Sequence, residues 1–210
     1  MRRSLLGLLT VAAIGGLLLT AGCEVFQQDP TLRVVSINGG KSLRADIADY
    51  YSYFDPIDSE YILIYQYMPD TVEVVLEYIE IGAGLPTWTP YVATVTEAKI
   101  KYTSTNADDP FPYEPSTVTI PLRQTVKADA SGKLTTAFKM TAMSATFKQL
   151  SYEGEVQEPP PNGEYNIVDL IKATITFTAY DSVADRTVKT AGDFAIEVGN
   201  FYDDLNRFGQ

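Results

Sequence analysis

The chain of 210 residues carries 16 basic and 27 acidic residues, for a net charge of −11, and it contains one cysteine and no histidine. This acidity excludes nucleic-acid binding through counterion release, which needs a basic face. The missing histidines exclude histidine-based catalytic triads and, with only one cysteine, predict that the protein holds no zinc, haem iron or copper cofactor.

The chain begins with a segment typical of export signals. Arg2 and Arg3 precede an uncharged, mostly apolar run from Leu5 to Leu19, which ends in Leu19-Thr-Ala-Gly-Cys23. The segment resembles the signal and lipobox of bacterial lipoproteins. That resemblance implies cleavage before Cys23, acylation of its thiol with palmitate or a similar chain, and a lipid-anchored protein of the cell envelope. An uncleaved spanning helix is the alternative, although the run is shorter than the roughly 20 residues that a span needs.

The expected organisation has three parts. Residues 1–22 form the signal, 23–30 the lipidated cysteine with a short polar tether, and 31–210 a single domain. Removal of the signal removes two of the 16 basic residues and none of the 27 acidic ones, so the net charge falls from −11 to −13. Anionic lipids repel such a chain, so the acyl groups must hold it at the membrane. Glu24, where retained lipoproteins often carry aspartate, favours the outer membrane.

Strand-like runs recur along the domain between turn signals. The clearest is Leu170–Tyr180, in which apolar residues alternate with lysine, threonine and tyrosine, and Thr71–Glu80 alternates in the same way. No stretch shows a sustained helical period. The expected strands, in chain order, are Thr31–Asp49 with a kink at its glycines, Thr71–Glu80, Ala93–Ser104, Ser116–Leu122, Lys133–Leu150, Leu170–Tyr180 and Thr187–Val198.

Strands at this spacing predict an all-β fold of two packed antiparallel sheets. The pairing of Ala173–Tyr180 with Thr187–Val198 is similar to the last hairpin of an immunoglobulin-like domain. The domain also resembles small bacterial envelope lipoproteins with one such domain, a family without an activity to carry over. The residues behind this resemblance are Ser42-Leu-Arg-Ala-Asp-Ile-Ala48, Val72–Glu77, Val118-Thr-Ile-Pro121, Asp193-Phe-Ala-Ile-Glu-Val198 and Asn200-Phe201. We therefore expect an immunoglobulin-like β-sandwich with a tyrosine-rich insertion after its first strand.

The insertion, about Tyr50–Met68, holds six of the 14 tyrosines. Tyrosine offers a large contact area with a polar tip at low entropic cost, which suits recognition surfaces. The alternative is that the insertion packs as an extra strand, with Tyr61, Leu63, Tyr65 and Tyr67 facing the domain.

Two further loops are rich in proline, aromatic and acidic residues. Because consecutive strands of a sandwich run up and down, the strand order places Tyr50–Asp70, Thr105–Pro115 and Ser151–Asp169 at the end away from the anchor. Each proline-rich loop is either a stiff connection or part of a contact surface. We expect contacts with a partner from Tyr51, Tyr53, Phe54, Phe111 and Tyr113.

Other chemistry is weakly indicated. Asp55, Asp58, Asp108 and Asp109 are oxygen ligands of the kind that calcium prefers, but their spacing is not that of a calcium loop. Trp88 stacks on a sugar or closes one end of the fold.

The glutamates do not indicate catalysis. Glu73 and Glu77 share the wet face of one strand and Glu80 lies on the other, which does not make the acid/base pair of a glycosidase. The sequence therefore predicts a non-catalytic binding or structural module that contacts an envelope protein. The alternative is a carbohydrate-binding protein or a carboxylate-based cell-wall hydrolase.

Overall fold

A computed structural model describes residues 31–79, 93–105, 111–128, 133–157, 166–182 and 185–201 of the chain. The predicted signal, Cys23 and the tether lie outside these ranges. So do Glu80, Trp88, Asp108, Asp109 and the triple-proline run at 159–161.

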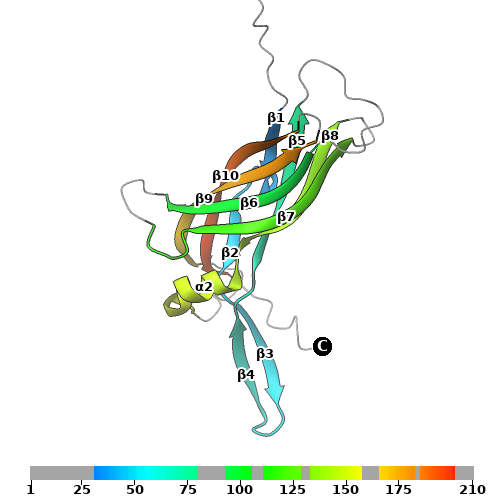
Figure 1. Cartoon of the computed structure of the whole chain (residues 1–210). Helices are drawn as coiled ribbons and strands as arrows, with labels where there is room; N and C mark the ends of the chain where they lie inside the picture. Colours follow the sequence, from blue (N-terminus) through cyan, green and yellow to red (C-terminus); the bar gives the residue numbers. More distant parts are fainter. Residues whose placement is uncertain are drawn as a thin grey trace, which may run out of the picture.

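The described chain is built of strands with one short α-helix, as the sequence predicted for an all-β protein (Figure 1). Its elements, in chain order, are β1 (Thr31–Ile37), η1 (Asn38–Gly40), β2 (Leu43–Asp46), β3 (Asp49–Asp55), β4 (Glu60–Gln66), β5 (Asp70–Ile79), β6 (Ala93–Ser104), β7 (Thr117–Ala128), β8 (Leu134–Met143), α2 (Ala145–Tyr152), η2 (Glu153–Glu155), β9 (Asn166–Asp181) and β10 (Arg186–Asn200).

Eight of these strands form one curled sheet in the order β1-β5-β8-β7-β6-β9-β10-β2, and β3 pairs only with β4. Every pair in the curled sheet is antiparallel except β10 with β2. The link between β7 and β8 is short, with Lys127 opposite Thr135 and Ala128 opposite Leu134. The sheet turns at this link, and its first strand comes back against β10. A Cβ placed on Gly192 of β10 would lie 3.0 Å from side-chain atoms of Val34 and Ile37 in β1.

The core fills the inside of the curl, and the alternation of the sequence is confirmed there. The inward residues of β9, which are Ile171, Ala173, Ile175, Phe177 and Ala179, are all buried. The same is true of the predicted inward face of β5, which consists of Val72, Val74, Leu76 and Tyr78. Burying one Val, Leu, Ile or Phe side chain contributes about 1.5–3 kcal/mol.

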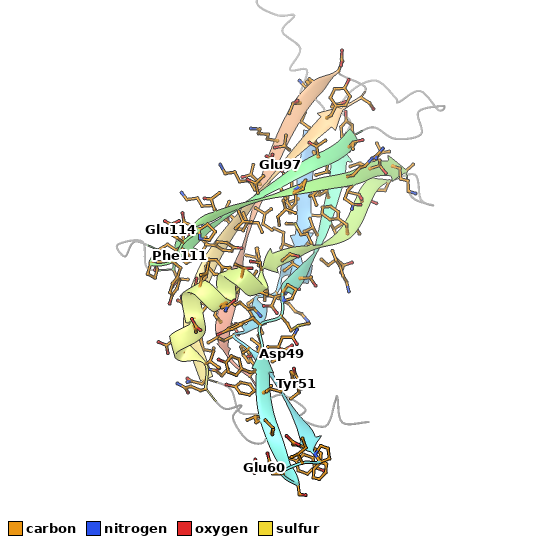
Figure 2. All side chains as sticks on the ribbon, turned by 60° about the horizontal axis from the view of Figure 1, so that its bottom comes forward. Asp49, Tyr51, Glu60, Glu97, Phe111 and Glu114 are labelled. Atoms are coloured by element: carbon orange, nitrogen blue, oxygen red, sulfur yellow. The ribbon has the colours of Figure 1, made fainter. Side chains whose placement is uncertain are left out.

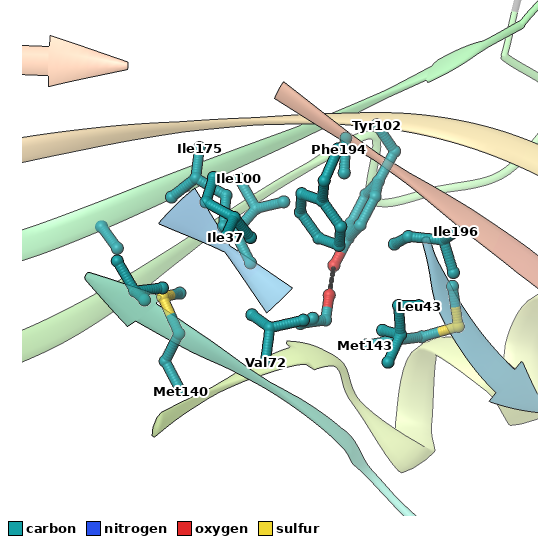
Figure 3. Close-up of a cluster of buried hydrophobic side chains, with 14 of the residues drawn as sticks. Ile37, Leu43, Val72, Ile100, Tyr102, Met140, Met143, Ile175, Phe194 and Ile196 are labelled. Atoms are coloured by element: carbon teal, nitrogen blue, oxygen red, sulfur yellow. Dashed lines mark hydrogen bonds between the residues drawn. The ribbon is translucent and has the colours of Figure 1, made fainter. Parts of the chain in front are cut away.

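Tyr102 brings a polar atom into this core (Figure 3). Its hydroxyl donates a 2.6 Å hydrogen bond to the carbonyl oxygen of Ala142, so the phenol is satisfied without water. Burial raises the pKa of Tyr102 to about 12, which keeps the hydroxyl protonated as the donor. The bond ties β6 to the end of β8, where α2 begins.

The expected single strand Thr31–Asp49 is instead divided between the two edges of the sheet. β1 pairs with β5, and β2 pairs with β10 at the other edge. The break lies at Asn38, Gly39 and Gly40, whose φ angles are 52°, 62° and 78°. Such angles interrupt an extended strand, and glycine adopts them at little cost. The kink was predicted, but the change of edge was not.

The expected absence of helix is wrong for Ala145–Tyr152. The predicted strand Lys133–Leu150 ends at Met143, and α2 starts directly after Ser144. The Ser144 hydroxyl accepts a hydrogen bond of 3.1 Å from the Phe147 amide, which caps the helix. Phe147, Lys148 and Tyr152 are buried against the sheet, so tertiary packing supports a helix that is too short to be stable alone.

The end of β10 is expected to require glycine at position 199 for full stability. The β9–β10 register shifts between Val198 and Gly199, and a Cβ on Gly199 would lie 2.3 Å from the carbonyl oxygen of Asn166. We predict that Gly199→Ala lowers the free energy of unfolding by about 1–3 kcal/mol, since the backbone must move to admit the methyl group.

Urea denaturation measures this difference. Gly154→Ala is the matched control, because no heavy atom lies within 4 Å of its Cβ position, and it should change stability by less than about 0.5 kcal/mol. Equal effects of the two substitutions would contradict the prediction.

Candidate functional site: a projecting tyrosine-rich hairpin

β3 and β4 form a hairpin that leaves the curled sheet beside α2 and projects at the end opposite the start of β1 (Figure 1). Its register runs from Asp49 opposite Gln66 to Asp55 opposite Glu60. Residues 56–59 make the turn, in which Ser59 has a φ of 54° and the Asp55 carboxylate accepts a 2.8 Å hydrogen bond from the Ile57 amide. The segment predicted as a tyrosine-rich insertion, about Tyr50–Met68, thus forms a hairpin with its own small sheet.

The two faces of the hairpin follow from its register, because residues directly opposite each other point to the same side. One side, here called the tyrosine face, carries Tyr50, Phe54, Tyr61, Leu63 and Tyr65. Ring centroids lie 5.4 Å apart in the Phe54–Tyr61 pair and 5.7 Å apart in the Tyr50–Tyr65 pair. Cross-strand aromatic pairs of this kind stabilise a hairpin.

The opposite side is also apolar at its centre. Tyr51 lies opposite Ile64 there, with the Asp49–Gln66 pair at the base of the hairpin and the Asp55–Glu60 pair near the tip. Asp49, Tyr51, Gln66 and Met68 line a hollow of about 190 Å³ at the base (Figure 2 labels Asp49 and Tyr51). The hairpin therefore carries apolar side chains on both faces, and neither face is wholly polar.

Large apolar side chains of the hairpin are exposed. The exposed fractions are 50% for Phe54, 75% for Tyr61, 48% for Tyr65 and 88% for Ile57 at the turn. Tyr50 is buried, and Tyr67 packs partly against the core. The alternative of a packed extra strand is therefore wrong for the outer part of β4. A two-stranded hairpin is marginal in water by itself, and a contiguous exposed apolar patch marks an interaction surface.

The charge of the hairpin has one sign. The sequence has no lysine or arginine between Arg44 and Lys99, while Asp49, Asp55, Asp58 and Glu60 all belong to the hairpin. The site is therefore both aromatic and anionic, and its chemistry suits recognition of a surface that carries positive charge.

A buried ion pair holds the base of the hairpin to α2. The Lys148 Nζ lies 2.6 Å from Asp70 Oδ2 at the start of β5, and the Lys148 side chain is only 1% exposed. Burial raises the pKa of the Asp70 carboxyl, and the Asp49 carboxylate adds to this, while Lys148 opposes both. Burial also raises the pKa of the Tyr67 hydroxyl, with smaller contributions from Tyr65 and Glu153. These groups fix how the hairpin meets the domain.

Phe111 and Tyr113, two of the predicted contact residues, lie in a different setting. With Tyr102, Phe147 and Tyr152 they form what we call the aromatic cluster, under α2. The Phe111 ring stacks on that of Phe147 at 6.3 Å, and the rings of Tyr113 and Tyr152 are 4.7 Å apart. The Tyr152 hydroxyl donates to Asp169, and burial raises its pKa. Phe111 and Tyr113 are half-buried packing residues (Figure 2 labels Phe111).

The described parts of the segments predicted at the end away from the anchor meet at α2, whereas residues 106–110 and 158–165 lie outside the described ranges. The hairpin reaches α2 through Asp70 and Lys148, and the 111–113 segment reaches α2 through Tyr113 and Tyr152. Among the predicted contact residues, Phe54 is exposed and Tyr51 is half-buried at the hollow. Tyr53 lies in β3, and its side chain is outside the described part of the structure. Tyr61 was not among the predicted contacts, although it is the most exposed aromatic residue described.

Of the glutamates considered for catalysis, Glu77 is engaged in ion pairs. Glu77 binds Arg33 at 2.5 Å and Lys133 at 3.0 Å, and these two partners lower its pKa. In the described ranges, no three His, Cys, Asp or Glu side chains come together in a group that could hold a metal ion. No described helix has the length and apolar character needed to cross a membrane.

Comparison of the chain with models of known protein families, and with curated proteins, found no match.

The Lys148–Asp70 pair yields a prediction about stability and pH. We expect Lys148→Met to lower the free energy of unfolding by about 2–4 kcal/mol at neutral pH, because it leaves a largely buried carboxylate unpaired. The loss should shrink as pH falls. Without Lys148, burial and Asp49 raise the pKa of Asp70 further, and protonation in the folded state removes the cost of burying the charge.

Denaturation of the variant and the parent across acidic to neutral pH measures this effect. The double variant Asp70→Asn/Lys148→Met serves as the control, since it removes both charges and should regain more than half of the loss. A deficit that grows with acidity would contradict this account of the junction.

Proposed function

We propose that the protein is a lipid-anchored, non-catalytic envelope lipoprotein whose hairpin contacts a protein partner. The observation that carries the proposal is the exposure of apolar side chains on a projecting ribbon of uniform negative charge. A buried ion pair at its base holds this ribbon in place, so it is presented as a preformed surface.

We also propose that the curled sheet is an immunoglobulin-like sandwich. The strand pairs support it, because β5 pairs with β8 and β9 pairs with both β6 and β10. The division of the first strand supports it too, with β1 on the β5 side and β2 parallel to β10 on the other side. The two layers would be β1-β5-β8 and β7-β6-β9-β10-β2, joined by the short β7–β8 link.

The anchor and the hairpin fit one orientation. Cys23 precedes Thr31 by eight residues, a length that spans at most about 29 Å. β1 starts at the end of the domain opposite the hairpin (Figure 1). A lipid on Cys23 would therefore hold the β1 end near the membrane and direct the hairpin away from it, toward other envelope proteins. No observation on the described residues favours the glycan-binding or hydrolase alternative.

The anchor itself is tested by Cys23→Ser. We expect this variant to take up no labelled palmitate and to leave the membrane fraction, because the thiol is the only one in the chain. Incorporation of label at the level of the parent protein would rule out this anchor, whereas loss of label with intact folding supports it.

The contact surface is tested with two variants, one that removes exposed side chains of the hairpin and one that removes a packed side chain of the domain. We predict that Phe54→Ala/Tyr61→Ala weakens capture of the partner by about 30-fold, the effect of losing a hot spot of about 2 kcal/mol. The same change should cost the hairpin only about 0.2–1 kcal/mol of stability. Crosslinking in intact cells followed by recovery of the protein measures capture.

Phe111→Ala is the contrasting variant, because its ring belongs to the aromatic cluster. It should lower the free energy of unfolding by about 2–4 kcal/mol and leave capture by the folded fraction unchanged. Unchanged capture by Phe54→Ala/Tyr61→Ala would exclude the hairpin as the contact surface.

A further inference from the structure

A second surface of the chain has the chemistry that the hairpin lacks. On the outward side of β6, Lys99 and Lys101 are exposed in the middle of the sheet, and threonines stand beside them on both neighbouring strands. Lys99 lies between Thr119 of β7 and Thr176 of β9, and Lys101 lies between Thr117 and Thr174. We call this surface, made of Lys99, Lys101, Thr117, Thr119, Thr174 and Thr176, the Lys/Thr face.

The two lysines of this face are available for a partner. Among the described residues, the side chain of neither Lys99 nor Lys101 takes part in a hydrogen bond or ion pair. The nearby carboxylate of Asp193 is already engaged, because Lys172 lies 2.8 Å away and the Thr174 hydroxyl donates to it at 2.6 Å. The face therefore offers two unpaired positive charges, each flanked by threonine side chains on the neighbouring strands.

The charge of the hairpin decides between two ways in which copies of the chain could associate. Edge-to-edge pairing of two hairpins that point the same way would bring Asp55, Asp58 and Glu60 of each copy toward the same residues of the other, and like charges placed opposite each other are destabilising. Placement of the hairpin on the Lys/Thr face instead brings opposite charges together. Aromatic rings there meet lysine ammonium groups and stems, a favourable contact for both.

We propose that the hairpin of one copy docks on the Lys/Thr face of a second copy. The side of the hairpin that carries Tyr51, Asp55 and Glu60 faces the second copy. Asp58 at the turn and Glu60 pair with Lys99 and Lys101, while Tyr51 lies over the threonine methyl groups. Lys99 and Lys101 are two residues apart on β6, a separation of about 6.8 Å, and the two strands of the hairpin lie about 4.8 Å apart. The two spacings are similar, so two carboxylates near the tip can reach the two lysines. The contact rests on the proposed function, since it names the partner of the same hairpin.

The contact would produce open chains of molecules. The donor surface and the acceptor surface are different parts of the protein, so each copy can use both at once, and such head-to-tail contacts continue unless the rotation closes a ring.

A zero-length carbodiimide coupling tests the contact, because it adds no spacer and therefore joins a carboxylate to a lysine amine that lies in direct contact with it. Isotopically heavy and light copies of the full chain are mixed in detergent, coupled, digested with chymotrypsin and examined by mass spectrometry. We expect mixed heavy–light products that join the 55–61 segment to Lys99 or Lys101. The total yield of heavy–light products, counted over all linked residues, should fall by about tenfold in Lys99→Gln/Lys101→Gln and in Asp58→Asn/Glu60→Gln.

The matched control is Lys41→Gln/Lys139→Gln, which removes the same charge from two exposed lysines elsewhere and should leave the yield unchanged. Asp55 is left intact in every variant because its carboxylate holds the turn. An equal loss of product in this control would show an effect of net charge alone and would overturn the proposed docking.

Charge reversal gives a second measurement by light scattering. Asp58→Lys/Glu60→Lys and Lys99→Glu/Lys101→Glu should each remain monomeric alone. Their equimolar mixture should associate, because each hairpin then meets a face of opposite sign. Failure of the mixture to associate, while the parent protein does, would overturn the assignment of these residues.

The two proposals fail in different ways. Photo-reactive residues are placed at positions 61 and 62, one on each side of β4. If they couple to another envelope protein in intact cells and never to a second copy, the docking inference falls and the proposed function stands. If neither couples to any protein, both fall.

Discussion

The pairing of β2 with the end of β10 determines where the hairpin leaves the domain. Four residues of β2 lie parallel to β10, from Leu43 opposite Ile196 to Asp46 opposite Gly199. The Ile47 amide then donates a 2.8 Å hydrogen bond to the Gly199 carbonyl, and Ile47 and Ala48 are buried before β3 begins at Asp49. The chain is thus fixed immediately before it leaves the sheet, and α2 fixes it again at Asp70 on its return. Beyond Tyr50 and Tyr67, which pack at its base, the hairpin has no strand pairing with the curled sheet, which explains why its outer side chains are exposed.

Sequence alternation predicted most of the strands because each has one wet and one buried face. β5 and β9 are the clearest cases, since valine, isoleucine and phenylalanine alternate there with threonine, lysine and glutamate. The same reasoning failed at Ala145–Tyr152. That helix has only eight residues, and its stability comes from contacts of Phe147 and Tyr152 with distant rings, which no local pattern records. It also missed the change of edge after Gly40, because alternation shows which face is buried and not which strand lies alongside.

The candidate site was predicted from the residue composition of the insertion, and composition alone does not show which of its side chains are exposed. A run of tyrosine and phenylalanine predicts contact area, but it does not distinguish an exposed ring from a packed one. Phe54 and Phe111 show the difference, since the first is half exposed and the second stacks on Phe147 under α2. Tyr61 was overlooked because its neighbours read as a packed strand. The lysines of β6 were passed over because the large negative net charge of the chain hid their clustering on one face.

The division of the first strand between two edges also has a mechanical consequence. A pull between the proposed lipid at Cys23 and a partner on the hairpin would act along the strand axes. It would draw β1 against β5 and β2 against β10, with the ladder bonds of both pairs lying across the direction of force. Bonds in that arrangement must break together in shear, whereas a hairpin pulled apart at its open end unzips one bond at a time. The arrangement suits a tether that stays folded under tension while the envelope and its partner move relative to each other.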